Sequence, residues 1–362
     1  MRRFAVARSL FPPTTLAGAV RRMGFVQADP IRAPARAQDL ILRHRVKGYR
    51  AGDLERRYVE LGIEEDFFLA YGFVTREVHA LMHPRPETGV PADSPAPWPS
   101  TRRRRARLVL EFVRQRGEAH PREVDRQFAH GKVRNWWGGS SNATTFLLDA
   151  MHYRGMLRVA RREAGIRVYS ARDLSSSAAD PVEARARLDA LVDVAVGIYA
   201  PLPEASLRNV IGRLRFAVPQ WRGELKNAMR RARERLAHAR VEGVDWYWPA
   251  GERPRAEPPE KVRLLTPFDP MTRDRDRFEL LWGWVYRFEA YTPVRKRKLG
   301  YYALPLLWRD RVIGWANLSV KNGRLQSDAG FVHAPEGRRA FARELDAELE
   351  RMRTFLGLRV QE

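Results

Sequence analysis

In the middle of the chain, hydrophobic residues recur with the spacing of amphipathic helices, and this pattern is followed by the strict alternation that is typical of strands. Four elements are predicted there: helices at residues 101–117, 120–128 and 140–155, then a two-stranded hairpin at 156–171. In the first of these helices Thr101 precedes apolar positions that include Leu108, which predicts a Thr cap and a buried Leu108. Gly117 should end that helix, and the Glu-Ala-Gly sequence at 163–165 should form the hairpin turn.

The same order of patterns occurs a second time downstream. Helical spacing covers residues 180–199, 203–214 and 221–237, and alternation at 239–248 predicts a hairpin that turns at Glu242 and Gly243. Three helices followed by a hairpin is the order of a winged-helix module. Such modules place their third helix in the DNA major groove, although some serve protein–protein contacts, so both uses stay open.

Pro-rich stretches divide the chain, and a strand-rich pattern fills its last part. The Pro-rich stretches cover residues 83–100 and 249–261, and residues 173–181 form the joint between the two series. Beyond them, residues 262–333 alternate with turns at Arg309-Asp310 and Asn322-Gly323, and an amphipathic helix is predicted at 335–356. We therefore expect four domains, at residues 1–95, 100–172, 180–250 and 260–362.

The net positive charge of the chain indicates a polyanionic partner. Lys and Arg number 66 against 43 Asp and Glu, so the formal charge of the 362 residues is +23. The first fifty residues hold eleven basic side chains and two acids, Asp29 and Asp39, which favours a polyanionic partner over a generally basic proteome. Cys is absent, which excludes disulfides and thiolate chemistry. Without a long apolar run, we expect a soluble, cytoplasmic protein that has no membrane contact.

Few motifs of established chemistry are present. The eight His residues show neither HExxH nor H-x-H spacing, and no phosphate-binding Gly-rich loop occurs, so we expect neither a metal nor a cofactor. The acids in residues 63–68 are predicted to cap or start a helix. Residues 268–282 mix acids and arginines, which predicts a self-satisfied ion-pair surface, with Asp269 capping a loop.

Residues 24–34, GFVQADPIRAP, place a carboxylate in the most basic part of the chain. If a strand continues through this segment, Gln27 and Asp29 point to the same face and can hold a water molecule together. Basic neighbours should then favour the ionised form of Asp29. The alternative is a structural role, in which Asp29 pairs with Arg32 or Arg36 and fixes the turn at Pro30.

Three blocks of the sequence resemble the YcaQ/AlkZ-type winged-helix DNA glycosylases that act on interstrand crosslinks. They are residues 24–46, 136–169 and 264–318. The resemblance implies a mainly α-helical, C-shaped protein with small β-sheets, in which three tandem winged helices rest on a β-rich C-terminal domain. It also implies a catalytic Gln-Φ-Asp motif, which here is Gln27-Ala28-Asp29. The family's aromatic-then-His pattern is altered, because Tyr71 and Phe73 are followed only at a distance by His79.

The activity implied by this resemblance is monofunctional hydrolysis of the N-glycosidic bond of N7-alkylated purines, including the unhooking of crosslinks. Asp29 would stabilise the oxocarbenium-like sugar, and Gln27 would position the water. The implied partner is double-stranded DNA with alkylated or crosslinked guanine, bound by a monomer in a bacterial, nucleoid-associated setting. A non-enzymatic winged-helix regulator or damage-recognition factor is the alternative. Candidate phosphate contacts are Arg32, Arg36, Arg43, Arg45, Arg102, Arg103, Arg104 and Arg105.

Overall fold

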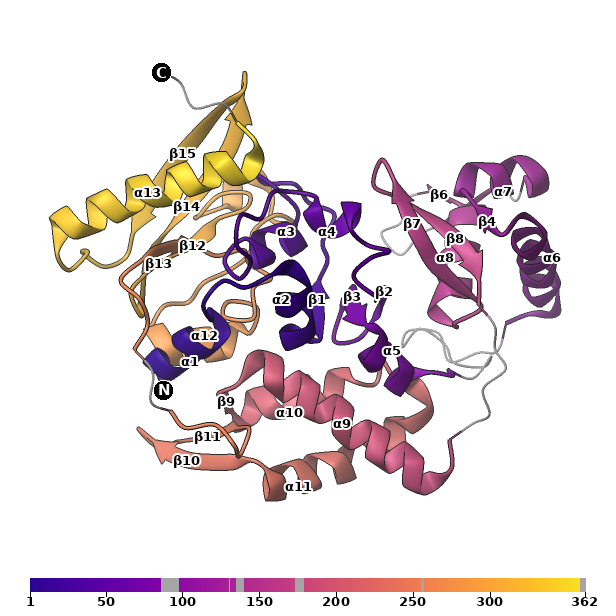
Figure 1. Cartoon of the computed structure of the whole chain (residues 1–362), viewed down its shortest axis with the longest axis horizontal. Coiled ribbons are helices and arrows are strands. Elements are labelled where there is room, and N and C mark those ends of the chain that lie inside the picture. Colours follow the sequence, from indigo (N-terminus) through magenta and orange to yellow (C-terminus); the bar gives the residue numbers. More distant parts are fainter. Residues whose placement is uncertain (86–97, 130, 135–139, 173–178, 255–256, 359–362) are drawn as a thin grey trace. The chain divides into compact units, whose positions relative to one another are not determined.

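The chain combines helices with several small antiparallel sheets. The computed structural model describes residues 1–85, 98–129, 131–134, 140–172, 179–254 and 257–358 (Figure 1). They form two compact units. The first contains residues 1–56, 193–210 and 230–362, and the second contains residues 57–192 and 211–229. None of the helices in the described residues is long and apolar enough to cross a bilayer.

The N-terminal part of the first unit leads the chain into the candidate site. It contains α1 (Arg2–Ser9), α2 (Leu16–Met23), β1 (Phe25–Gln27), α3 (Ala37–Leu42) and α4 (Asp53–Arg56). Thr15 caps α2, because its hydroxyl oxygen accepts the Gly18 N–H at 3.1 Å. Gly24 ends α2 at a φ of 68°, a left-handed conformation that favours glycine, and β1 starts at the next residue. Helix α2 therefore has a defined start at Thr15 and a defined end at Gly24, and the chain enters β1 directly from that end.

A four-stranded sheet forms the C-terminal part of the same unit. Its elements are α12 (Arg275–Trp282), β12 (Val262–Leu264), β13 (Leu304–Trp308), β14 (Arg311–Lys321), β15 (Arg324–Phe331) and α13 (Arg338–Leu356). The strands pair antiparallel in the order β12-β13-β14-β15, and α13 lies along the sheet (Figure 1). The turns at Arg309-Asp310 and Asn322-Gly323 and the terminal helix are confirmed. The prediction of a strand-rich region at 262–333 holds only in part, because residues 265–303 form helices and loops instead of strands.

The second predicted series of three helices and a hairpin is present in its predicted order. It comprises α9 (Pro181–Tyr199), β9 (Leu202–Pro203), α10 (Glu204–Arg213), the 3₁₀ helix η1 (Pro219–Glu224), α11 (Leu225–Arg235), β10 (Ala237–Val241) and β11 (Val244–Trp248). Glu242 and Gly243 have φ values of 51° and 77°, so the turn of the hairpin falls where the sequence predicts it. Strand β9 pairs with β11 and extends the hairpin to three strands.

The first series lies in the second unit. This unit contains β2 (Ile63–Phe67), β3 (Tyr71–Thr75), α5 (Arg76–Met82), α6 (Ser100–Arg116), β4 (Glu118–Ala119), α7 (Pro121–Phe128), β5 (Lys132–Arg134), β6 (Ser140–Asn142), α8 (Ala143–Tyr153), β7 (Leu157–Glu163) and β8 (Ile166–Ala171). Helix α6 ends at Gly117 as predicted, but Thr101 does not cap it, because the helix already begins at Ser100. Leu108 is 50% exposed, since the buried face of α6 runs through Ala106, Val109 and Val113 instead.

The acids at 63–68 do not cap a helix, so that prediction is wrong. They lie in β2, which pairs antiparallel with β3, and Glu64, Glu65 and Asp66 are all buried. Each meets an arginine distant in the sequence. The pairs are Arg158 with Glu64, Arg162 with Glu65 and Arg85 with Asp66, at N···O distances of 2.6, 2.6 and 2.8 Å. Local sequence held no sign of these partners, which explains why the helix-capping interpretation fails.

Candidate active site

Gln27 is the last residue of β1, and Asp29 lies just beyond the strand. The premise that one strand runs through both residues is therefore wrong, because β1 ends at Gln27. The Asp29 carboxylate instead accepts the Ile31 N–H at 2.9 Å, an Asx-type turn that fixes the backbone around Pro30. One carboxylate oxygen, Oδ1, is used in this way.

The orientation of the Gln27 amide is set by Arg273. The Arg273 guanidinium Nε donates to Gln27 Oε1 at 2.6 Å, and the same guanidinium lies 5.5 Å from the centre of the Tyr199 ring. Because a guanidinium can only donate, the amide oxygen faces Arg273 and the amide NH₂ group is turned away from it. Gln27 is therefore held as a hydrogen-bond donor on its other side.

This contact also corrects the interpretation of residues 268–282. They are not a self-satisfied ion-pair surface, because Arg273 bonds Gln27 and the fully buried Asp269 bonds Arg45, both from the N-terminal part of the chain. The predicted loop-capping role of Asp269 is confirmed, since its Oδ1 accepts the Met271 N–H at 3.0 Å. Residues 268–282 thus hold the N-terminal segment that carries Gln27 and Asp29 through these side-chain contacts.

Asp29 does not sit among cations as its sequence neighbours suggest. Within the part of the chain that the structure describes, no Lys or Arg nitrogen lies within 4.0 Å of its carboxylate, and Arg36 pairs with Glu55 instead. Burial raises the pKa of Asp29, and the hydrogen bond from Ile31 opposes that rise. A half-buried carboxylate with a raised pKa is a stronger base than a solvated one.

Three of the eight candidate phosphate contacts are used inside the protein. Arg45 is completely buried, and its two terminal nitrogens bond both oxygens of Asp269 at 2.7 and 3.0 Å. Arg43 pairs with the buried Glu348 at 2.7 Å, and Arg36 pairs with Glu55. A guanidinium whose side chain is buried in an internal ion pair is poorly placed to reach a phosphate, which argues against Arg43 and Arg45 as DNA contacts.

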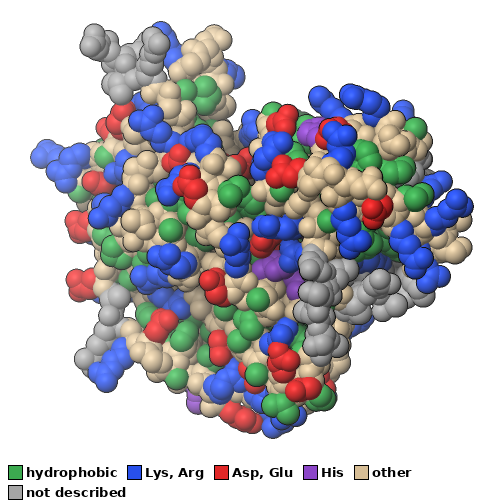
Figure 2. Space-filling view, turned by 45° about the vertical axis from the view of Figure 1, so that its right-hand side comes forward, with side chains coloured by type: hydrophobic (Ala, Val, Ile, Leu, Met, Phe, Trp, Pro, Cys, Tyr) green, Lys and Arg blue, Asp and Glu red, His purple; other side chains and the backbone are tan. Residues whose placement is uncertain are grey.

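The other five candidates differ in exposure. Arg103, Arg104 and Arg105 lie exposed in the first turns of α6, while Arg102 is half-buried with its guanidinium 5.3 Å from the Phe146 ring centre. Arg32 is exposed beyond Asp29. Figure 2 shows Lys and Arg side chains over much of the visible face, with Asp and Glu between them. Total charge alone therefore does not single out a DNA-binding face.

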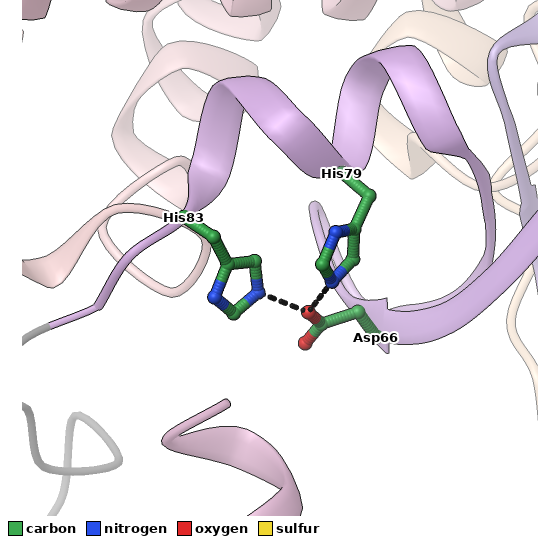
Figure 3. Close-up of side chains that lie close together, drawn as sticks. All are labelled: Asp66, His79 and His83. Atoms are coloured by element: carbon green, nitrogen blue, oxygen red, sulfur yellow. Dashed lines mark hydrogen bonds and ion pairs between the residues drawn. The ribbon is translucent and has the colours of Figure 1, made fainter. Parts of the chain in front are cut away.

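A cluster in the second unit has the donor types of a metal site. Asp66 on β2, His79 on α5 and His83, which directly follows α5, bring their ligand atoms within 4.8 Å of one another (Figure 3). His83 Nε2 lies 2.7 Å from Asp66 Oδ2, and His79 Nε2 lies 3.3 Å from the same oxygen. The two rings stack, with centres 4.2 Å apart. The i, i+4 spacing of these histidines is visible in the sequence, and our expectation of no metal did not consider it.

The neighbours of this cluster fit a buried charge network better than a cation site. Arg85 donates to the other Asp66 oxygen at 2.8 Å, and Arg172 donates to His79 Nδ1 at 3.2 Å. Because Arg172 occupies Nδ1, the ring proton of neutral His79 sits on Nε2 and faces Asp66. Two guanidinium charges would also repel a divalent ion.

The ionisation of the cluster follows from these contacts. Burial would raise the pKa of Asp66, but the Arg85 guanidinium and the hydrogen bonds from the two histidines hold it well below its usual range. Burial lowers the pKa of His83 to about 3, and the Arg85 charge acts in the same direction. Burial also lowers the pKa of His79. Asp66 is therefore ionised and both rings are neutral near pH 7.

Comparison with known proteins relates the chain to DNA glycosylases. The family model described as DNA glycosylase AlkZ-like matches residues 20–355, which include Gln27, Asp29 and Arg273. Among solved structures, the chain is similar to the Streptomyces sahachiroi DNA glycosylase AlkZ, with a TM-score of 0.61 and 15% sequence identity. The match covers 99% of this chain and 96% of that chain. At this identity the structural likeness concerns the fold alone.

Proposed function

This chain belongs to the AlkZ-like DNA glycosylase family, and from that premise we propose that it hydrolyses the N-glycosidic bond of N7-alkylated purines in duplex DNA. The product is an abasic site, and the substrates include N7-linked interstrand crosslinks, which the enzyme unhooks. The observation that carries this proposal is Asp29, a half-buried carboxylate beside Gln27 without a cationic partner within 4.0 Å among the described residues.

The chemistry of the substrate suits such a site. A purine alkylated at N7 is already cationic, so it leaves without a general acid, and positive charge passes to the sugar as the bond breaks. A fixed carboxylate beside that sugar stabilises the developing charge, and an Arg or Lys paired to the carboxylate would cancel the effect. The absence of an ion pair at Asp29 thus has a mechanistic reason.

The two candidate residues have different tasks. Arg273 holds the Gln27 amide oxygen and turns the amide NH₂ group away from itself, so Gln27 donates to the attacking water and orients its lone pairs. The proton of that water must therefore go to Asp29, whose Oδ2 is not used by the Ile31 N–H. The raised pKa of Asp29 favours this transfer.

The two series of three helices and a hairpin, α6 to β8 and α9 to β11, serve as winged-helix modules that hold the duplex. This use is supported by the predicted order of their elements and by the exposed arginines at the start of α6. We retain the functional division into residues 1–95, 100–172, 180–250 and 260–362, and a monomer as the active species.

The test is a duplex with one N7-methylguanine and a second duplex with a nitrogen-mustard crosslink. Wild-type protein should create abasic sites that alkali converts to strand breaks, and crosslinked strands should separate. Asp29→Asn should reduce base release about 10²- to 10⁴-fold, because it removes the base and the anion together. Asp276→Asn, at an exposed acid of the same unit, is the matched control and should retain wild-type activity. An Asp29→Asn protein as active as the wild type would refute the assigned role.

A further inference from the structure

An exposed loop between α12 and β13 carries aromatic and basic residues that the proposed mechanism does not use. We call residues 291–301 the Tyr291 loop. Its sequence, YTPVRKRKLGY, has four consecutive cations, and one 3₁₀ turn, η2 (Val294–Lys296), is its only regular element. Tyr291 is 77% exposed and Val294 is 76% exposed. A large aromatic ring held in solvent beside cations is unusual for a surface that contacts only water.

Hydrogen bonds from neighbouring side chains hold the backbone of the loop. The buried carboxylate of Glu289 accepts the backbone N–H groups of Lys298 and Leu299 at 2.8 and 2.7 Å. From β14, Asn317 donates to the Leu299 carbonyl at 2.7 Å. Arg297 folds back and donates to the Thr292 carbonyl at 2.8 Å. The loop backbone is therefore preorganised, and ligand binding needs little further ordering of it.

The loop borders a groove that also meets the candidate catalytic segment. This groove has a volume of about 990 Å³, and its lining includes Arg32, Pro34, Tyr301, Tyr302, Ser319 and Gln326. Arg32 and Pro34 lie within five residues of Asp29 in the chain, while Tyr301 ends the Tyr291 loop. Burial raises the pKa of Tyr291 and of Tyr302, and in both the Asp29 charge adds to the rise, which agrees with their closeness to that carboxylate.

We propose that the Tyr291 loop binds DNA next to Asp29, with an unstacked base packed on the Tyr291 ring and phosphates of the same strand at Arg295, Lys296 and Lys298. These three cations are exposed, unlike Arg43 and Arg45. An aromatic face beside a row of cations is the combination with which proteins hold unpaired nucleotides. An acidic protein could pair with the cations, but it would have no base to stack on the Tyr291 ring, so the combination favours DNA as the ligand. The assignment rests on the proposed function, since it names the part of the chain that holds DNA at the same site.

Tyr291→Ala tests the stacking contact. Base stacking on an aromatic ring is worth about 1–3 kcal/mol, so affinity for a duplex that contains an abasic-site analogue should fall about 5- to 150-fold. Tyr291→Phe should bind within about twofold of wild type, because stacking needs the ring and not the hydroxyl. Fluorescence anisotropy of labelled DNA measures both. Unchanged affinity in Tyr291→Ala would overturn the proposal, as would equal losses in both variants.

The phosphate contacts are tested by the salt dependence of the same binding. Removing three phosphate contacts with R295A/K296A/K298A should reduce the slope of log K against log salt by about 2.7 for B-form DNA. The matched control is R338A/R339A/R343A, which removes three exposed cations from α13 in the same unit. Equal changes in slope for both triple variants would show a general charge effect and overturn the assignment. The assignment would also be overturned if the protein bound poly-glutamate and Tyr291→Ala weakened that binding as much as it weakens DNA binding.

These measurements separate the two proposals because they need no catalysis. If Asp29→Asn abolishes base release while the loop variants bind DNA like wild type, the loop assignment fails and the glycosylase function stands. If the loop variants lose DNA binding while wild-type protein releases no alkylated base, the loop assignment stands and the proposed reaction fails.

Discussion

The neutral histidines around Asp66 make the stability of the protein depend on pH. His83 titrates with a pKa of about 3 in the folded chain, against an ordinary value of 6.5. Between these values the unfolded chain binds a proton that the folded chain does not bind. The contribution of His83 to stability is therefore complete above about pH 6.5 and is lost as the pH falls toward about 3. At about pH 5 the loss amounts to about 2 kcal/mol.

His83→Gln tests this reasoning, because a Gln amide nitrogen can replace Nε2 as the donor to Asp66 but does not titrate. Urea unfolding at about pH 7.5 and about pH 5 should show that wild type loses about 2 kcal/mol more than the variant over this interval. His333→Asn, at an exposed histidine, is the control and should follow wild type. If wild type and His83→Gln lose equal stability, the pKa of His83 is not lowered by its surroundings and the reasoning is refuted. His79 acts in the same direction, so some acid sensitivity should remain in the variant.

Three further predictions concern the candidate site and its support. Arg273→Ala should slow single-turnover base release about 10- to 100-fold, because it frees the Gln27 amide to rotate, and DNA affinity should change little; equal rates would contradict the positioning role. The rate of base release should fall as the pH drops, with a midpoint above the ordinary Asp value of 3.8, because burial raises the pKa of Asp29 and only its ionised form acts; a rate-against-pH profile measures this, and a midpoint at or below 3.8 would contradict it. Arg45→Met should destabilise the first unit by about 3–5 kcal/mol in urea unfolding, because it leaves Asp269 buried and unpaired, and the double variant Arg45→Met/Asp269→Leu should recover most of the loss; a double variant no more stable than the single one would contradict this account.

Periodicity in the sequence predicts most elements of the fold because local patterns determine them. Both hairpin turns of the helical series and the β14–β15 turn of the C-terminal sheet need residues that tolerate positive φ, and Gly165, Gly243 and Gly323 mark these positions. The acidic strand β2 is missed because its charges are balanced by arginines outside the local sequence, such as Arg85 for Asp66 and Arg162 for Glu65. No local rule predicts a strand that buries three carboxylates.

For the candidate site, too, the sequence predicts one part and not the other. The Gln-Φ-Asp spacing is readable in the sequence, but the environment of the carboxylate is not. A count of neighbouring cations suggests that Asp29 is surrounded by positive charge, while the fold directs Arg36, Arg43 and Arg45 to Glu55, Glu348 and Asp269. Since each of these pairs joins residues at least 19 positions apart, the charges near Asp29 in sequence are not its neighbours in space.

This redistribution of charge gives the site its proposed chemistry. Arg273 orients the Gln27 amide, while among the described residues no Lys or Arg nitrogen lies within 4.0 Å of the Asp29 carboxylate, which in the proposed reaction keeps its charge for the sugar. Had Arg36 turned to Asp29, the carboxylate would be a stable ion pair and a poor proton acceptor. The internal ion pairs of the basic N-terminal segment therefore do more than stabilise the fold. They keep cations away from the carboxylate that we propose faces a positively charged sugar, and they leave the proposed DNA contacts to exposed cations elsewhere, such as those of the Tyr291 loop.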